Sequence, residues 1–154
     1  MNDFGGTAFP VNFEGLTDRQ LHRLAGISRG VQFAAGEEIF REGDPAGKCW
    51  FIRSGRVILT ATVPGRGEVT VETLSHGDVL GVSWLRAPRL WEWSASAVAA
   101  TTAVELDVAT LESLAQDEPA IGRGVYLTLS RSLLHRLQAT RARLLNVYVQ
   151  EHVQ

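Results

Sequence analysis

The chain has 154 residues, of which 45% are hydrophobic and 21% charged. This favours one globular domain and argues against two domains or a disordered chain. The 15 Lys and Arg residues are balanced by 17 Asp and Glu residues, giving a formal net charge of −2, so no overall positive field would draw the chain to nucleic acid or to an anionic membrane. The single cysteine, Cys49, excludes an internal disulfide, and no apolar run is long enough to span a bilayer, so the sequence predicts a cytoplasmic protein.

Residues 1–15 are predicted to form a flexible leader, because they are rich in Gly and Asn and show no apolar period, with order beginning after Val11. A short amphipathic helix is expected next. Thr17 can cap its N-terminus, and Gln20 stands three residues later, at the second position of a capping box. The apolar face of this helix would hold Leu21, Leu24 and Ile27.

From Val31 to Val108 the sequence changes to short β-prone runs separated by Gly, Pro and Asp. Many short strands at such spacing are typical of a barrel or roll, and residues 16–118 are predicted to form one sensor domain with the first helix. The glycines between the runs suit turns that need positive φ. The expected strands are Val31–Phe33, Glu38–Arg41, Cys49–Arg53, Val57–Val63, Val69–Leu74, Trp93–Ala100 and Ala103–Val108.

Two helices are expected to close the chain. A short one covers Thr110–Gln116, and Pro119 suits the first turn of a much longer helix that reaches about Val149. At 1.5 Å per residue this helix would extend roughly 45 Å, more than a small roll needs. Residues 119–154 are therefore predicted to form a dimerisation helix, with a seam at Tyr126, Leu129, Leu133, Leu137, Thr140, Leu144 and Val147, and Tyr148 beside it.

Three linked turns carry a family resemblance: Gly36 with Ile39-Phe40, then Glu42-Gly43-Asp44, then Trp50 to Val57 with Gly55 inside it. Together with the run from Leu74 to Gly81, they resemble the cyclic-nucleotide-binding domain of the catabolite-activator and anaerobic-regulator (Crp/Fnr) superfamily over about Leu16 to Tyr148. The resemblance implies a mainly β fold with flanking helices: a double-stranded β-helix, jelly-roll-like, followed by a long C-terminal helix.

In that family the phosphate-binding cassette holds a Glu that bonds the ribose hydroxyl and an Arg that pairs with the cyclic phosphate. Here the matching positions are Val82, in Gly81-Val82-Ser83-Trp84, and Trp93, before Ser94. Val cannot accept a hydrogen bond, and Trp cannot neutralise a phosphate. The cassette is therefore predicted to be degenerate for cyclic AMP and cyclic GMP.

Other cassette side chains leave a second interpretation open. Ser83, Ser94 and Ser96 could donate to a phosphate, the amides after Gly81 could help, and Arg86 and Arg89 lie nearby in the sequence. The alternative is that both arginines lie in a solvated surface turn and the serines on exposed edges.

Three of the four tryptophans, Trp84, Trp91 and Trp93, lie within a stretch of ten residues at this cassette. They could stack on a nucleobase, anchor a protein interface, or replace a missing ligand with packed side chains. The loss of both polar ligands favours a filled pocket or an interface over base stacking.

No catalytic residues, metal site or cofactor is predicted. His22, His76, His135 and His152 lack the spacing that places two ligands on one face. Cys49 suits a buried inert thiol, and Asp117-Glu118 suit the positive end of the long helix better than a catalytic pair. The chain is therefore not expected to be an enzyme.

The last helix carries a basic run that could suggest nucleic acid: Arg131, His135, Arg136, Arg141 and Arg143. Because these positions flank an apolar stripe, they are interpreted as the solvated charges of a coiled coil. Only Gln150–Gln154 follow, where the family's regulators have a helix-turn-helix domain, so no DNA binding is expected.

The sequence thus predicts a regulatory or adaptor homodimer that docks to a larger assembly. Short proteins of this type with a Trp-rich cassette resemble ones encoded beside multi-subunit redox enzymes, including hydrogenases, where one serves as an accessory subunit. A sensor that binds a cyclic or other nucleotide through a non-standard cassette is the alternative, and a purely structural dimeric spacer is the third.

Overall fold

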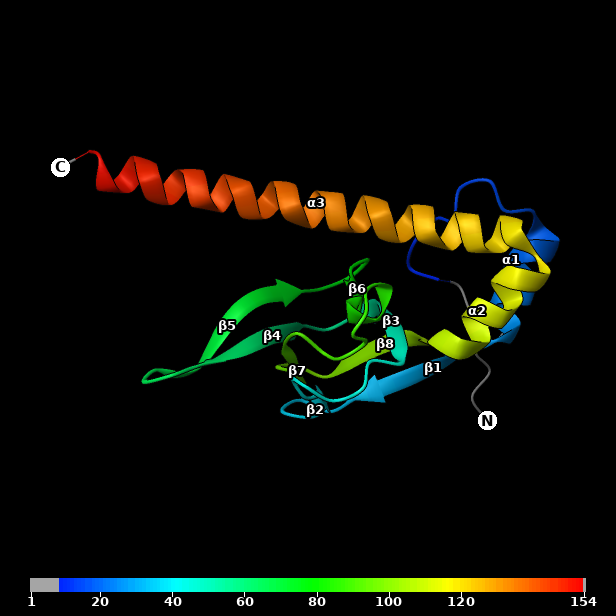
Figure 1. Cartoon of the computed structure of the whole chain (residues 1–154), viewed down its shortest axis with the longest axis horizontal. Helices are drawn as coiled ribbons and strands as arrows, with labels where there is room; N and C mark the ends of the chain where they lie inside the picture. Colours follow the sequence, from blue (N-terminus) through cyan, green and yellow to red (C-terminus); the bar gives the residue numbers. More distant parts are fainter. Residues whose placement is uncertain (1–8, 154) are drawn as a thin grey trace.

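The computed structural model describes residues 9–153. Within them, helix α1 (Asp18–Gly26) precedes eight strands, and helices α2 (Val108–Asp117) and α3 (Pro119–Glu151) follow the strands (Figure 1). The strands are β1 (Ser28–Phe33), β2 (Glu38–Phe40), β3 (Lys48–Ser54), β4 (Val57–Val63), β5 (Gly67–Leu74), β6 (Val79–Leu80), β7 (Ser94–Ala97) and β8 (Thr101–Asp107), with a short 3₁₀ turn, η1 (Ser83–Leu85), after β6.

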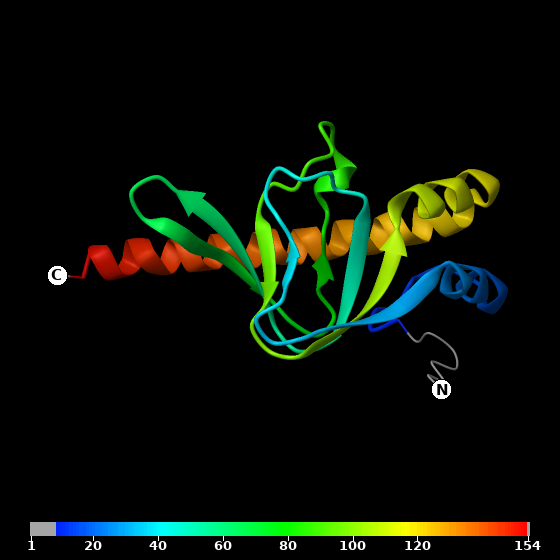
Figure 2. The same cartoon turned by 90° about the horizontal axis from the view of Figure 1, so that it is seen from below.

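The described strands form two four-stranded antiparallel sheets, in the orders β1-β8-β3-β6 and β2-β7-β4-β5. Strands distant in sequence are neighbours, as in the pairing of β1 with β8, so the chain winds into a roll with one side of each sheet facing inward. Seen from below, the β4–β5 hairpin projects from the roll in the same direction as the C-terminal half of α3 (Figure 2). The predicted jelly-roll-like, mainly β fold with flanking helices is confirmed.

The strand predictions are confirmed in position and differ at their ends. β4 has the expected bounds, whereas β1 begins three residues earlier, at Ser28. The expected run Trp93–Ala100 ends at Ala97, because the chain bends over the next residues before β8. β6 was not predicted, because a strand of two residues has no period to detect.

The starts of α1 and α3 are confirmed, whereas α2 begins at Val108, two residues before the predicted start at Thr110. The Thr17 hydroxyl accepts from the Gln20 amide at 3.2 Å, and the Thr17 amide donates to the Gln20 side chain at 2.9 Å, which completes the capping box. Pro119 occupies the first turn of α3.

Part of the predicted leader, residues 1–15, packs against the sheet, so order begins before Val11, where its start was expected. The Phe9 and Phe13 rings pack edge to face at 4.9 Å, and each lies 5.6 Å from Phe51 of β3. Phe13 is only 3% exposed, so burial of aromatic surface holds this segment against the sheet. Residues 1–8 lie outside the described part of the chain.

The first turns of α3 belong to the core, and the rest of the helix leaves the roll. Gly122 lies against Ala115 of α2, where an added Cβ would come within 2.7 Å of the Ala115 Cβ, so this contact needs glycine. Beyond Leu133 most side chains of α3 are exposed, and this half of the helix runs in the same direction as the β4–β5 hairpin (Figure 1). Among residues 9–153 no helix is both long and apolar enough to cross a bilayer.

Candidate functional site

The cassette predicted from the sequence begins where β6 ends, at Gly81. Gly81 has φ +86°, and a Cβ added there would lie 3.0 Å from the Lys48 carbonyl oxygen, 3.0 Å from the Trp91 ring and 3.1 Å from the Trp50 ring. Only glycine meets both requirements without strain. The cassette backbone is thus pressed against two indole rings inside the roll.

Those two rings belong to an aromatic stack, defined here as Phe40, Trp50 and Trp91. Phe40 and Trp91 lie face to face with centroids 3.8 Å apart, and Trp50 lies 5.8 Å from Phe40 and 6.0 Å from Trp91. Both tryptophans are about 95% buried. The interior of the roll beside Gly81 is therefore filled by side chains of the chain itself.

The other two cassette tryptophans also pack inward. Trp84 is 1% exposed, and its indole N–H donates to the Gly81 carbonyl at 2.9 Å, while its ring lies 6.2 Å from Tyr126 of α3. Trp93 is half-buried against the core, as is Val82. Trp84 and Trp91 are too buried to offer a free ring face to a base.

Three of the polar groups that could bind an anion have partners within the chain, and the two serines among them accept and keep an O–H to donate. The Ser94 hydroxyl accepts from the Glu42 amide at 2.9 Å, and the Ser83 hydroxyl accepts from the Glu92 amide at 3.2 Å. Arg89 pairs with Glu112 of α2 through bonds of 2.7 and 3.2 Å. Ser96 is half-buried within β7.

A hollow of about 610 Å³ lies at the outer side of the cassette, and we name it the cassette hollow. Of the predicted site residues it contains Val82, Ser83 and Arg86, but not Ser94, Ser96, Arg89 or Trp93. Its lining has one arginine against two carboxylates, Glu42 and Glu92. This charge balance does not favour a phosphate. The full lining is Glu42, Gly43, Val82, Ser83, Arg86, Pro88, Leu90, Trp91 and Glu92.

The inner face of the roll also holds a buried carboxylate that was not predicted. Glu105 of β8 accepts from the Trp50 indole N–H at 2.8 Å, and Arg29 and Lys48 lie 2.9 and 3.3 Å from its other oxygen. Because side chains alternate along β8, Glu105 lies on the same face as the buried Ala103. This alternation is the one sequence feature that could have predicted an inward-facing carboxylate.

Cys49 is fully buried on β3, and burial raises the pKa of its thiol to about 12, with the nearby Glu105 charge adding to this effect. The geometry agrees with the expectation of an inert thiol, because the thiolate is the reactive form.

The predicted seam on α3 needs one correction. Leu129 is 1% exposed and packs in the core of the single chain, so it is not available to a partner. Leu133 is half-buried, whereas Tyr126, Leu137, Thr140, Leu144 and Val147 are exposed. The predicted seam did not include three further exposed apolar side chains of α3, namely Leu134, Leu145 and Val149.

The prediction that the basic run of α3 is solvated is wrong for Arg136. Its guanidinium binds both Glu72 oxygens of β5, at 3.0 and 2.7 Å, and donates to the Val79 carbonyl at 2.9 Å. The two side chains are 13% and 17% exposed. This bidentate pair is a strong contact that holds the middle of α3 to the strands leading into the cassette. Arg131 also has a carboxylate partner, Glu14.

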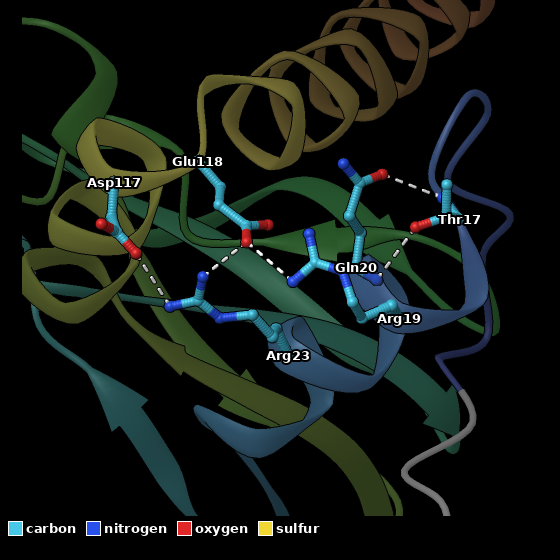
Figure 3. A network of polar contacts seen from close by, with 6 residues as sticks. All are labelled: Thr17, Arg19, Gln20, Arg23, Asp117 and Glu118. Carbon is cyan, nitrogen blue, oxygen red and sulfur yellow. Dashed lines mark hydrogen bonds and ion pairs between the residues drawn. The ribbon is translucent and has the colours of Figure 1, made fainter.

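Asp117 and Glu118 join three helices. Figure 3 shows Arg19 and Arg23 of α1 reaching across to Glu118 at the α2–α3 junction, at 3.0 and 2.6 Å, while Arg23 also binds Asp117 at 3.0 Å. These bonds lower the pKa of Glu118, with the Arg23 hydrogen bond as the main cause. The two carboxylates therefore hold α1 against the junction of α2 and α3.

The chain matches known proteins over most of its length. The family model described as the cyclic nucleotide-binding domain matches residues 30–118. The CRP-like cAMP-activated global transcriptional regulator of Mycobacterium tuberculosis is 26% identical over 121 residues, which are 79% of this chain and 54% of that protein. The chain thus spans about half the length of this relative.

Two solved structures have the same fold. A cyclic nucleotide-binding domain from Methylobacillus flagellatus superposes with a TM-score of 0.78 at 20% identity, covering 88% of this chain and 76% of that one. The catabolite activator protein of Thermus thermophilus gives a TM-score of 0.67 at 25% identity, covering 87% of this chain and 62% of that one.

Proposed function

Because the chain belongs to the cyclic nucleotide-binding domain family, we propose that it is a non-catalytic regulatory module whose ligand pocket is filled by its own aromatic side chains. It acts as an adaptor homodimer that docks to a larger assembly, a multi-subunit redox enzyme such as a hydrogenase. The observation that carries the proposal is the aromatic stack, whose Trp50 and Trp91 rings lie against Gly81.

The cassette chemistry supports a pocket that does not take cyclic nucleotides. Val82 and Trp93 stand where the family resemblance places a ribose-binding Glu and a phosphate-binding Arg, and both pack against the core. Desolvating a phosphate without a counter-charge costs several kcal/mol. The arginine that lines the cassette hollow, Arg86, shares it with two carboxylates.

The long helix supports the dimer. Its exposed apolar side chains continue far beyond the last contact with the roll, and a helix with such a stripe needs a partner to bury it. A second copy of α3 presents the same stripe, as an isologous interface requires.

The first test is calorimetric titration of the purified dimer with cyclic AMP and cyclic GMP. We expect no saturable binding tighter than about 1 mM, because the pocket is full and lacks both polar ligands. Micromolar binding of either nucleotide would overturn the proposal.

A double variant separates a filled pocket from one that lacks only its ligands. Val82→Glu with Trp93→Arg restores both polar groups of the family cassette. If the stack fills the space, the folded double variant still binds neither cyclic AMP nor cyclic GMP. Affinity for them then appears only when Trp91→Ala is added to open the space. Binding by the double variant alone would show that the pocket was open throughout.

A second candidate function is a sensor that binds a nucleotide in the cassette hollow. The favouring observation is that this hollow of about 610 Å³ contains Ser83 and Arg86, which is room enough for such a ligand. This candidate predicts that some nucleotide in a panel of cyclic di-nucleotides and pyridine nucleotides binds, and that Arg86→Gln abolishes the binding. The adaptor proposal predicts that none of these nucleotides binds.

A further inference from the structure

A second hollow of about 440 Å³ opens at the mouth of the roll, and we name it the mouth pocket. It shares only Trp91 with the cassette hollow, so the two lie on different sides of the aromatic stack. Its volume and its position at the mouth of a β-roll are those of a small-molecule site. The lining is Phe33, Ile39, Phe40, Pro45, Gly47, Lys48, Trp50, Trp91, Glu105 and Asp107.

The apolar part of this lining is mostly aromatic. Phe33 meets Trp50 edge to face at 6.2 Å, and Phe40 stacks against both tryptophans, so the four rings pack together and the two half-buried ones, Phe33 and Phe40, form the wall of the hollow. Phe33, Ile39 and Phe40 are only half-buried, which leaves ring and aliphatic surface facing the hollow. Such a wall suits a planar apolar body, and its ring faces also attract cations.

The two carboxylates at this pocket are held by neighbouring groups, and the two cations paired with Glu105 are solvent-exposed. The Glu105 side chain is 10% exposed and is held by the Trp50 indole, whereas Lys48 and Arg29, which cover it, are 45% and 68% exposed. Asp107 is also held in place, because it accepts from the Thr110 amide at 3.0 Å and the Thr110 hydroxyl at 2.8 Å. The two carboxylates stay where they are, while the lysine can move away.

We propose that the mouth pocket binds a small aromatic amine. The ring lies on the wall of Phe33 and Phe40, and the ammonium displaces Lys48 from Glu105 and lies between Glu105 and Asp107. A primary ammonium offers three donors and one positive charge, which matches two fixed carboxylates two residues apart on one strand face. The site meets the cassette hollow only at Trp91, and the proposed amine does not require a nucleotide in the cassette.

Space for a substituent continues beside the carboxylates. An adjoining hollow of about 390 Å³ shares Lys48, Glu105 and Asp107 with the mouth pocket and extends over Ile27 and Arg29. The amine end of the ligand is thus the end that has room for additional groups.

The test is calorimetric titration of the full chain with phenethylamine and tryptamine, with quenching of tryptophan fluorescence as a second readout, because Trp50 and Trp91 line the pocket. As matched probes, 2-phenylethanol is neutral and 3-phenylpropionate is anionic, with rings of the same size. We expect saturable binding of the amines that is at least about tenfold tighter than binding of either matched probe. Equal binding of amine and alcohol, or no binding up to about 10 mM, would overturn the proposal.

Two variants test the assigned residues. Glu105→Gln keeps an acceptor for the Trp50 indole and removes the charge, so amine affinity should fall about tenfold or more, whereas Glu37→Gln, an exposed change outside the pocket, should leave it unchanged. Lys48→Met removes the competing ammonium, so amine affinity should rise several-fold. A fall with Lys48→Met, or no change with a folded Glu105→Gln, would contradict the site, and the Lys48 result decides the matter if Glu105→Gln does not fold.

Discussion

Gly81 shows at the scale of one residue how the cassette and the roll interior depend on each other. Its φ of +86° and the three heavy atoms within about 3.1 Å of an added Cβ leave no room for a side chain. The neighbouring rings are themselves packed, so they cannot retreat without opening a cavity. Burial also sets the chemistry of Cys49, which precedes Trp50 on β3 and is 0% exposed.

Gly81→Ala should destabilise the protein by about 2–4 kcal/mol, because it adds a left-handed backbone penalty to an overpacked contact. Urea unfolding measures the change. Gly65→Ala is the matched control, since its φ is +81° but nothing lies within 4 Å of the added Cβ. It should cost only about 1–2 kcal/mol. Equal losses in the two variants would show that the close contacts do not matter.

Cys49 should resist thiol reagents in the folded protein. Its buried thiol has a pKa raised to about 12, so almost none of it is thiolate at pH 8. We expect labelling by a disulfide reagent at pH 8 to be limited by unfolding and to become fast in denaturant. Rapid labelling of the native protein would mean that β3 opens locally.

At the scale of elements, two ionic contacts hold the helices to the roll and to each other. Arg136 joins α3 to β5 and β6, and Glu118 joins the start of α3 to α1. Between them lie the buried turns of α3, and past Arg136 the described part of the helix has no buried side chain. The orientation of the exposed half therefore depends on the Arg136 contact.

Arg136→Met should loosen the exposed half of α3 and destabilise the chain by about 2–4 kcal/mol, because it leaves the Glu72 carboxylate partly buried without its partner. Hydrogen exchange should speed up from about residue 136 onward. Combined with Glu72→Gln in a double-mutant cycle, we expect a coupling of about 1–3 kcal/mol. Additive effects would show that the pair does not act as a unit.

The Glu118 contact predicts a loss of stability in acid. The pKa of Glu118 is lowered from its ordinary value of 4.5, so its contribution is complete above about pH 4.5 and is lost as the pH falls through the lower value of the folded state. Glu118→Gln should be less stable than the wild type at pH 7, and the difference should shrink as the pH falls below 4.5. Thermal unfolding at several pH values, with Glu37→Gln as control, measures this; a constant difference would contradict it.

Local sequence patterns predicted the helices and strands well. The packing of the N-terminal segment and of the candidate site could not be predicted, because it depends on contacts between residues far apart in the sequence. Thr17, Gln20 and Pro119 act through neighbours a few residues away, so their caps could be predicted from the sequence. Phe13 depends on Phe51, which is far along the chain, and its own segment carries no period. The candidate site shows the same limit, because the cassette tryptophans were predicted but their partners Phe40 and Trp50 come from other strands.

At the scale of the whole molecule, the roll covers only part of α3. The apolar period of the helix runs on unchanged where the core ends, so the sequence could not separate Leu129, which is in the core, from Leu144, which is 56% exposed. Only the length of the roll decides where the core contact stops. The exposed remainder is the surface that the proposed dimer would bury.

Leu144→Glu should weaken the dimer at least about tenfold, since it places a charge in the proposed apolar seam. Sedimentation equilibrium measures the dissociation constant. Asn146→Glu is the control, because two helical positions turn the side chain by about 200°, away from the stripe. If neither variant changes the mass, or if the wild type is a monomer, the seam is not on this face.

The close contact between Gly122 and Ala115 bears on the position of the far end of α3. It sets α3 close on α2 near one end of a helix whose tip lies about 43 Å away, at 1.5 Å per residue to Glu151. Because Arg136 holds the middle of α3 to β5 and β6, a tilt of about 5° at Gly122 carries the tip through roughly 4 Å only when the contact between Arg136 and Glu72 shifts as well. A small adjustment between α2 and α3 would therefore be magnified into a displacement that a protein bound at the far end could detect.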